Sequence, residues 1–428
     1  MQKLFSEFTS TTSAQWKEQL VKDLKGIDYN TLVWKTNSGI DVQPFYTKEN
    51  LPEDPKPAFT SNDWAICEMV NVTDEKTANI RALNALQNGA SGLVFEISQT
   101  TDYAVLLKEI SLEHIYTLFK IRADQETELR SFLSTTNTGN NCFIELDPLL
   151  SGSPLPAITS AICVNTGIYQ EAGSDTIHEI AFSLAHINEY LHKADTDQTL
   201  SSLKNIHVSL SVGGDFFMEI AKLRALRKCI GFLTLQYQVN PLIHLHAQTT
   251  LINKSRIDSY NNMLRSTTEA MSASIGGANS ILVLPFDNEF HEPTDFSLRM
   301  ARNQQLILKD ESYLNVVADI AAGSYYIETL TETLCEKAWD VFKDIEAKGG
   351  LSACLKSNYI QDIISKDAEV LLAQFNEGKL VLVGVNKFQN KNETIINDSS
   401  KPANNTKAST SGIKPIKLSK LLEDQLAN

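Results

Sequence analysis

Residues 242–250 read LIHLHAQTT, and their side chains alternate in type. His244, His246 and Gln248 occupy every second position, with Leu245 and Ala247 between them. This period of two is typical of a β-strand, whose successive side chains point to opposite faces of the sheet. The segment is therefore either the wall of an active site or a strand that carries structural imidazoles. The choice depends on the elements around it.

An alternation of strands and helices surrounds this segment. Strand-like runs lie at 65–72, 92–97, 114–121, 142–148, 158–166, 206–213, 242–249 and 280–287, and helical patterns lie between most of them. Eight such units predict a (β/α)8 TIM barrel of mixed α/β class over residues 64–315. Between the fourth and fifth strands only LLSGSPLPA remains. That is too short for a helical crossover, so either a helix is lost there or a strand is misplaced.

Three segments flank the predicted barrel. Residues 1–63 form an N-terminal arm, with an amphipathic helix at 13–25, a hairpin within 31–47 and a proline-rich linker at 48–63. Residues 316–388 form a helical extension that ends in a closing strand. Residues 389–428 are rich in Asn, Lys, Ser and Thr and are predicted to be disordered, with a possible short terminal helix.

The inner face of the barrel follows from the alternation. If Leu245 and Ala247 pack on helices, then His244, His246 and Gln248 point inward. The same logic places more polar side chains inside the barrel, namely Glu96, Glu145, Asp147, His207, Ser209 and Ser211. These side chains could line a ligand channel or form a hydrogen-bonded core network. The last strand, ILVLPFD, argues against a channel because it offers only large apolar side chains or Pro285.

Composition excludes several functions. The formal net charge of −14 lacks the basic footprint that nucleic acids and anionic membranes require. No apolar run approaches the roughly 18–20 residues that span a bilayer. The six cysteines form no C-x-x-C pair, and the N-terminus lacks a signal peptide, so we expect a soluble cytoplasmic protein. There is no phosphate loop or nucleophile elbow, and we predict no metal site.

Several stretches resemble the methylmalonyl-CoA mutase family. EFTSTTSAQWKEQLVKDLKG resembles its N-terminal arm, and YQEAGSDTIHEIAFSLAHINEYL, DFFMEIAKLRALR, HAQTT and RMARNQQLILKDES resemble successive parts of its barrel. AAGSYYIETLTETLCEKAWDVFKDIEAKGG is similar to the helices that follow. The order is kept from the N-terminus to about residue 388. His246 aligns with the family's active-site histidine, and Gln248 stands beside it.

The departures from this family resemble its smaller, non-catalytic subunit. Catalytic chains end the eighth strand in His-Thr-Asn, whereas residues 283–290 read VLPFDNEF. The segment after the first strand, MVNVTDEKT, has no aromatic residue or arginine, and residues 147–158 hold no Arg or Lys to grip a substrate carboxylate. The Asp-x-His-x-x-Gly motif that ligates cobalt is absent from the sequence.

The resemblance therefore implies the small subunit of a heterodimeric methylmalonyl-CoA mutase, an isomerase of propionate metabolism that interconverts (R)-methylmalonyl-CoA and succinyl-CoA. Its large catalytic partner would bind adenosylcobalamin and the acyl-CoA, and this chain would bind no cofactor. His246 would be a vestigial catalytic residue, and Gln248 would be a substrate-binding residue. Alternatively, the barrel is catalytic together with a separate cobalamin-carrier subunit. A third hypothesis is an unrelated barrel enzyme with Glu96, Glu145 or Asp147 as general base.

Overall fold

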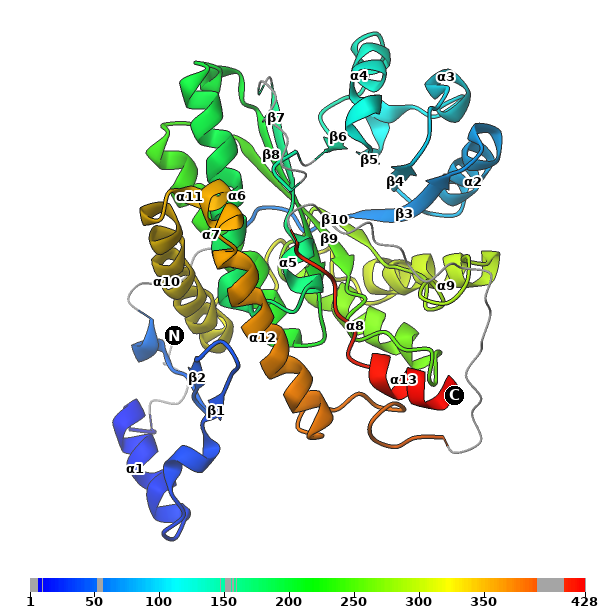
Figure 1. Ribbon diagram of the computed structural model, residues 1–428. Helices are drawn as coiled ribbons and strands as arrows, with labels where there is room; N and C mark the ends of the chain where they lie inside the picture. The colour runs from blue at the N-terminus through cyan, green and yellow to red at the C-terminus, as the bar shows by residue number, and fades with distance from the viewer. Residues whose placement is uncertain are drawn as a thin grey trace.

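The computed structural model describes residues 7–9, 11–51, 57–146, 148–150, 155, 158, 160–390 and 412–427. Its centre is a sheet of eight parallel strands in the order β6-β5-β4-β3-β10-β9-β8-β7 (Figure 1). The strands are β3 (Ala65–Val72), β4 (Gly92–Ile97), β5 (Tyr116–Lys120), β6 (Cys142–Glu145), β7 (Ala161–Asn165), β8 (Asn205–Val212), β9 (Leu242–Thr249) and β10 (Ser280–Leu282). The predicted (β/α)8 barrel is confirmed, and it is nearly closed.

Helices cover the outside of this sheet. In chain order they are α2 (Glu75–Gln87), α3 (Tyr103–Leu106), α4 (Glu126–Ser134), α5 (Gly167–Glu171), α6 (Thr176–Thr196), α7 (Phe216–Gln236), α8 (Asn261–Ile275) and α9 (Asp295–Leu306). The described residues between β6 and β7 contain a turn at 148–150 and no helix. Within the described residues, no backbone ladder joins β6 to β7, so the barrel has a seam at this place.

The last barrel strand is shorter than the sequence suggests. We expected it to run to residue 287, but β10 ends at Leu282. Pro285 lacks the amide that a longer ladder would need. The amide of Leu284 instead donates to the Thr249 hydroxyl at 3.0 Å. The chain therefore leaves the sheet early and turns towards α9.

The N-terminal arm stands apart from the barrel (Figure 1). It contains α1 (Ser13–Asp23) and a two-stranded ribbon of β1 (Trp34–Lys35) and β2 (Asp41–Val42). A capping box between Thr12 and Gln15 begins α1, and no residue of this helix is buried. The ribbon is tied to the helical extension, because the side chains of Asn37 and Gln374 exchange hydrogen bonds.

The helical extension packs on the barrel helices. It consists of α10 (Tyr325–Ala347), α11 (Gly350–Lys356) and α12 (Tyr359–Asn376). The expected closing strand is reduced to a single bridge between Val383 and Lys387. Buried Arg224 of α7 pairs with Asp319 and with Glu328 of α10. Removing Arg224 would leave two buried carboxylates without their cation, so this network helps to fix where α10 docks.

The end of the chain is more ordered than its composition predicts. Residues 412–427 pack against the barrel and end in α13 (Lys420–Ala427), where a short helix was expected. The amide of Leu418 donates to the Ile252 carbonyl at 3.0 Å, and Ile413 and Leu418 are buried. Predicted disorder was therefore wrong for these residues, because a few apolar side chains suffice to dock them. The rest of the predicted tail, 391–411, lies outside the described residues.

Candidate functional site

The opening segment forms β9, and its imidazoles point into the barrel as predicted. His246 is 0% exposed, and its Nδ1 lies 2.8 Å from the Ser280 hydroxyl on neighbouring β10. His244 reaches the same hydroxyl through Nε2 at 3.1 Å. One serine therefore orients both imidazoles.

Aromatic and imidazole rings fill the bore. Tyr116 enters from β5, and its ring centroid lies 5.0 Å from His244, 5.4 Å from His246 and 6.1 Å from His207 on β8. Phe143 of β6 lies 4.4 Å from His207. The Tyr116 hydroxyl and His207 Nε2 are 2.8 Å apart, within hydrogen-bond distance. We call Tyr116, Phe143, His207, His244 and His246 the ring stack.

Gly92 of β4 makes room for this stack. A Cβ atom added there would lie 2.7 Å from the Cys67 sulfur and 3.1 Å from the Tyr116 ring. No real side chain tolerates the shorter distance without a shift of its neighbour. The barrel interior is therefore closely packed around Gly92, as barrel cores are.

Burial keeps the three imidazoles neutral. It lowers the pKa of His244 to about 3, with a smaller contribution from the charge of Arg227. Burial also lowers the pKa values of His207 and His246 well below the usual value, and Lys120 and His244 lower them further. Neutral imidazoles cannot donate a proton as general acids near pH 7. The Nε2 atom of His246 is buried and has no hydrogen-bond partner among the described residues.

Above the ring stack, polar side chains line the carboxyl-terminal mouth of the barrel. Lys120 of β5 donates to the Gln248 Oε1 atom at 3.3 Å, although β5 and β9 lie four strands apart in the sheet order. Glu145 accepts hydrogen bonds from the Ser209 hydroxyl and, at 3.1 Å, from the Asn165 amide. This side of the barrel is where TIM-barrel enzymes hold their active sites.

The residues predicted to do chemistry are thus only partly brought together. Glu145 is 8% exposed and hydrogen-bonded, whereas Glu96 is exposed at the rim. Asp147 lies outside the described residues. Tyr116 and Lys120 were not predicted from the sequence. They share the inner face of β5 with Leu118, at every second position of the strand. The same period-two rule could have found them.

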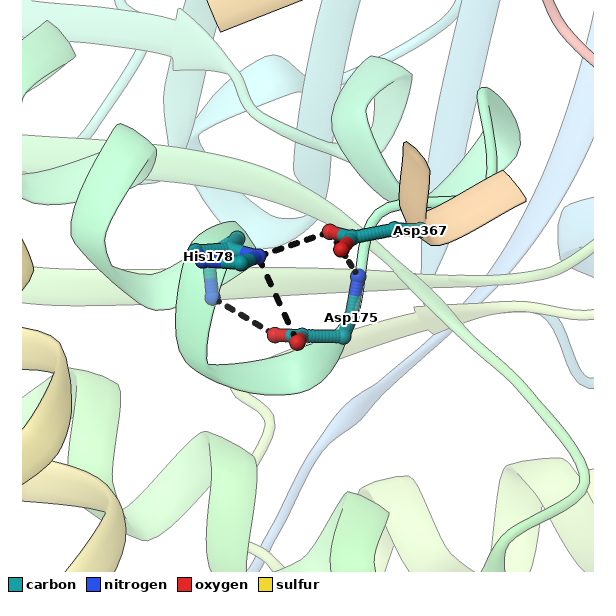
Figure 2. Close-up of side chains that lie close together, drawn as sticks. All are labelled: Asp175, His178 and Asp367. Carbon is teal, nitrogen blue, oxygen red and sulfur yellow. Dashed lines mark hydrogen bonds and ion pairs between the residues drawn. The ribbon is translucent and has the colours of Figure 1, made fainter. Parts of the chain in front are cut away.

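A second polar cluster lies outside the barrel, between α6 and α12 (Figure 2). Nδ1 of His178 lies 2.7 Å from Asp367 and 3.3 Å from Asp175. Of the described residues, only these three form a group of three or more that could hold a metal ion. Burial lowers the pKa of His178, but the hydrogen bond to Asp367 and both negative charges outweigh it, so the net shift is upward. The cluster is internally paired and joins the extension to the barrel.

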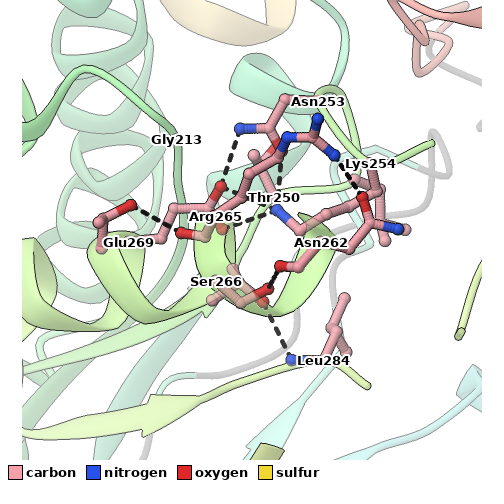
Figure 3. A network of polar contacts seen from close by, with 12 residues as sticks. Gly213, Thr250, Asn253, Lys254, Asn262, Arg265, Ser266, Glu269 and Leu284 are labelled. Atoms are coloured by element: carbon pink, nitrogen blue, oxygen red, sulfur yellow. Dashed lines mark hydrogen bonds and ion pairs between the residues drawn. The ribbon is translucent and has the colours of Figure 1, made fainter. Parts of the chain in front are cut away.

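A third network closes the barrel rim after β9 (Figure 3). Buried Lys254 donates to both oxygens of Glu269 at 2.8 Å and to Asn253 at 2.7 Å. Arg265 donates to the Asn262 side chain at 2.7 Å. Burial lowers the pKa of Lys254 and raises that of Glu269, and their mutual attraction opposes both shifts. These residues fix the loop that leads from β9 to α8.

Known proteins resemble this chain over most of its length. A family model described as methylmalonyl-CoA mutase matches residues 154–425. The methylmalonyl-CoA mutase small subunit of Porphyromonas gingivalis is 33% identical over 92% of this chain and 72% of that protein. The small subunit of Streptomyces virginiae is 28% identical over 90% of this chain and 71% of that protein. For the methylmalonyl-CoA mutase of Rhizobium meliloti, identity is 28%, and this chain covers 65% of that protein.

No described helix is long and apolar enough to cross a membrane. The sequence matches and the nearly closed barrel lead to the same assignment. This chain belongs to the methylmalonyl-CoA mutase family and resembles its small subunits.

Proposed function

We propose that this chain is the supporting, non-catalytic subunit of a heterodimeric methylmalonyl-CoA mutase of the cytoplasm. The ring stack is the observation that carries this proposal. Tyr116 spans the bore to His207 at 2.8 Å, and the rings around it leave His246 with 0% exposure. A substrate cannot reach His246 while these side chains keep their places.

The N-terminal arm supports a partner role. Val21, Ile27, Leu32, Trp34 and Phe45 are between 40% and 60% exposed on this short segment. They lie on α1, on β1 and in the segments that connect and follow them, and exposed apolar side chains can supply a protein-binding surface. Aromatic residues such as Trp34 are the usual hot spots of such surfaces. The large catalytic subunit is the partner that the small-subunit relatives suggest.

The cofactor of the holoenzyme, adenosylcobalamin, belongs on the partner in this proposal. His207 and His246 are fully buried, and His244 is held by Ser280. A corrin ring is too large to reach imidazoles inside a packed barrel, so these residues do not fit the role of cobalt ligand. What this chain contributes is a rigid barrel and an arm for the catalytic subunit.

A second candidate function is a catalytic barrel that works with a separate cobalamin-carrier subunit. The observation in its favour is the polar mouth, where Lys120 and Gln248 are only partly buried. This function would require the side chains around His246 to move, because His246 is 0% exposed.

Co-expression with the large mutase subunit of the same cell tests the proposal. We expect a one-to-one complex in size-exclusion chromatography, with mutase activity only in fractions that contain the large subunit and added adenosylcobalamin. Turnover by the purified chain alone, or with a free cobalamin carrier, would contradict it and favour the second candidate.

A further inference from the structure

A cavity of about 300 Å³ opens in the barrel wall at the seam between β6 and β7. Its walls come from α4, β6, β7 and α6, where a regular barrel would place another helix. This cavity lies beside the ring stack and is separate from the polar mouth. Its volume is at the lower end of the range for small-molecule sites.

The cavity penetrates the wall and does not merely lie on it. Cys142 and Ile144 point outward and pack with the helix-facing core of this half of the barrel. Phe143 and Cys163 point inward and pack in the barrel interior, yet they line the same cavity. Because no ladder joins β6 to β7 in the described residues, side chains from both faces meet there.

The lining mixes apolar and polar side chains, and its polar surface is somewhat the larger. Leu133, Ile144 and Ile158 supply aliphatic surface, while Ser134 and Ser160 lie among them. Arg130 stands at the rim and donates from Nε to Glu126 at 2.8 Å. Among the described residues its two terminal amino groups have no partner, and its side chain is 53% exposed. A guanidinium with free terminal groups can bind a carboxylate through two parallel hydrogen bonds.

We propose that this seam cavity binds a short-chain fatty acid, with the chain between β6 and β7 and the carboxylate at Arg130. The inference does not rest on the proposed function, because Arg130 and Ala161, which carry its test, belong to neither the ring stack nor the N-terminal arm. Glu126, which pairs with Arg130 and also lines the cavity, reduces the positive charge at the site, so a dianion such as phosphate should bind less well than a monoanion.

Titration calorimetry of the full chain with sodium hexanoate and with hexanol tests this site. We expect one hexanoate per chain with a Kd on the order of 1 mM, as suits so small a ligand. Arg130→Gln should weaken hexanoate about tenfold and hexanol less than twofold, because only the acid has a carboxylate. Arg81→Gln, an exposed arginine on α2, is the matched control and should change neither.

Ala161→Leu should abolish binding of both ligands, because Ala161 lines the cavity and the larger side chain would fill it. If this variant fails to fold, the ratio of hexanoate to hexanol affinity in Arg130→Gln is by itself the test of the proposed site. Absence of saturable binding to the wild type would overturn the proposal, as would equal weakening of acid and alcohol by Arg130→Gln.

Discussion

Aromatic side chains are buried in the barrel bore and exposed in the N-terminal arm. In the bore, Tyr116 is 3% exposed and sits among other rings. In the arm, Trp34 is 48% exposed and Phe45 is 54% exposed. A buried ring stabilises the chain that contains it, whereas an exposed one is available to another molecule. The difference indicates that the rings of the bore stabilise the fold, whereas the exposed rings of the arm are available to bind another protein.

The largest expected effect concerns the bore. Tyr116→Ala removes the ring that joins β5 to β8 and leaves His207 Nε2 without its partner. We expect the free energy of unfolding to fall by about 3–5 kcal/mol, as for other large-to-small core changes. Urea denaturation followed by circular dichroism measures it. A loss below about 1 kcal/mol would show that the ring stack is loosely packed. It would contradict the view that the rings of the bore stabilise the fold while those of the arm do not.

The arm is expected to show the opposite behaviour. Trp34→Ala should weaken binding to the large subunit on the order of 100-fold, as at aromatic hot spots. The free energy of unfolding of this chain should change by less than about 0.5 kcal/mol in Trp34→Ala, because the Trp34 side chain is half exposed. Surface plasmon resonance and urea denaturation provide the two numbers. Leu264→Ala, an exposed apolar residue on α8, is the control and should leave both unchanged if the arm is the interface.

A buried cluster of charged side chains is a third kind of environment, beside the aromatic bore and the exposed arm. Lys222 lies between Glu179, at 2.9 Å, and Glu219, at 2.7 Å, all nearly inaccessible. Burial raises the pKa of Glu179 from 4.5 to about 7, against the attraction of Lys222. The folded chain therefore binds more protons than the unfolded chain between these values, and stability falls as the pH rises from about 4.5 to about 7.

Glu179→Gln should flatten this dependence by on the order of 1 kcal/mol per pH unit in that window. Denaturant midpoints measured at several pH values test it. Glu128→Gln, an exposed residue on α4, should keep the wild-type slope. Identical slopes for wild type and Glu179→Gln would mean that the carboxylate stays ionised.

The smallest effect is expected at the mouth. Lys120→Met removes a single bond of 3.3 Å to Gln248 from a partly exposed side chain. We expect a stability change below about 1 kcal/mol and no change in turnover of the reconstituted complex. Turnover reduced by tenfold or more would place the mouth in the reaction and favour the catalytic-barrel alternative.

Much of the fold could be predicted because strand periodicity is local. The alternation in 242–249 predicted the inward face of His244 and His246. The short link between the fourth and fifth strands left a lost helix or a misplaced strand, and the described residues of that link contain no helix. Docking of 412–427 could not be predicted from composition. It depends on long-range contacts such as Ile416 amide to Glu171 carbonyl, at 2.8 Å.

Whether the bore is open or filled was harder to predict than which residues point into it. Period-two reasoning placed His246 inside but could not say whether the bore was open. That depends on the size and reach of Tyr116 from β5, opposite in the barrel, and on the absence of a side chain at Gly92. Packing across a barrel joins residues far apart in sequence, so no local pattern reveals it.

Turnover of the reconstituted complex with His246→Gln in this chain is the most direct measure of whether this barrel takes part in catalysis. Size-exclusion chromatography and circular dichroism would first confirm that the variant folds and assembles. We expect kcat and KM within about twofold of the wild-type complex, because His246 is 0% exposed within the ring stack. A loss of kcat of a hundredfold or more in a correctly assembled complex would contradict it and make this barrel a working active site.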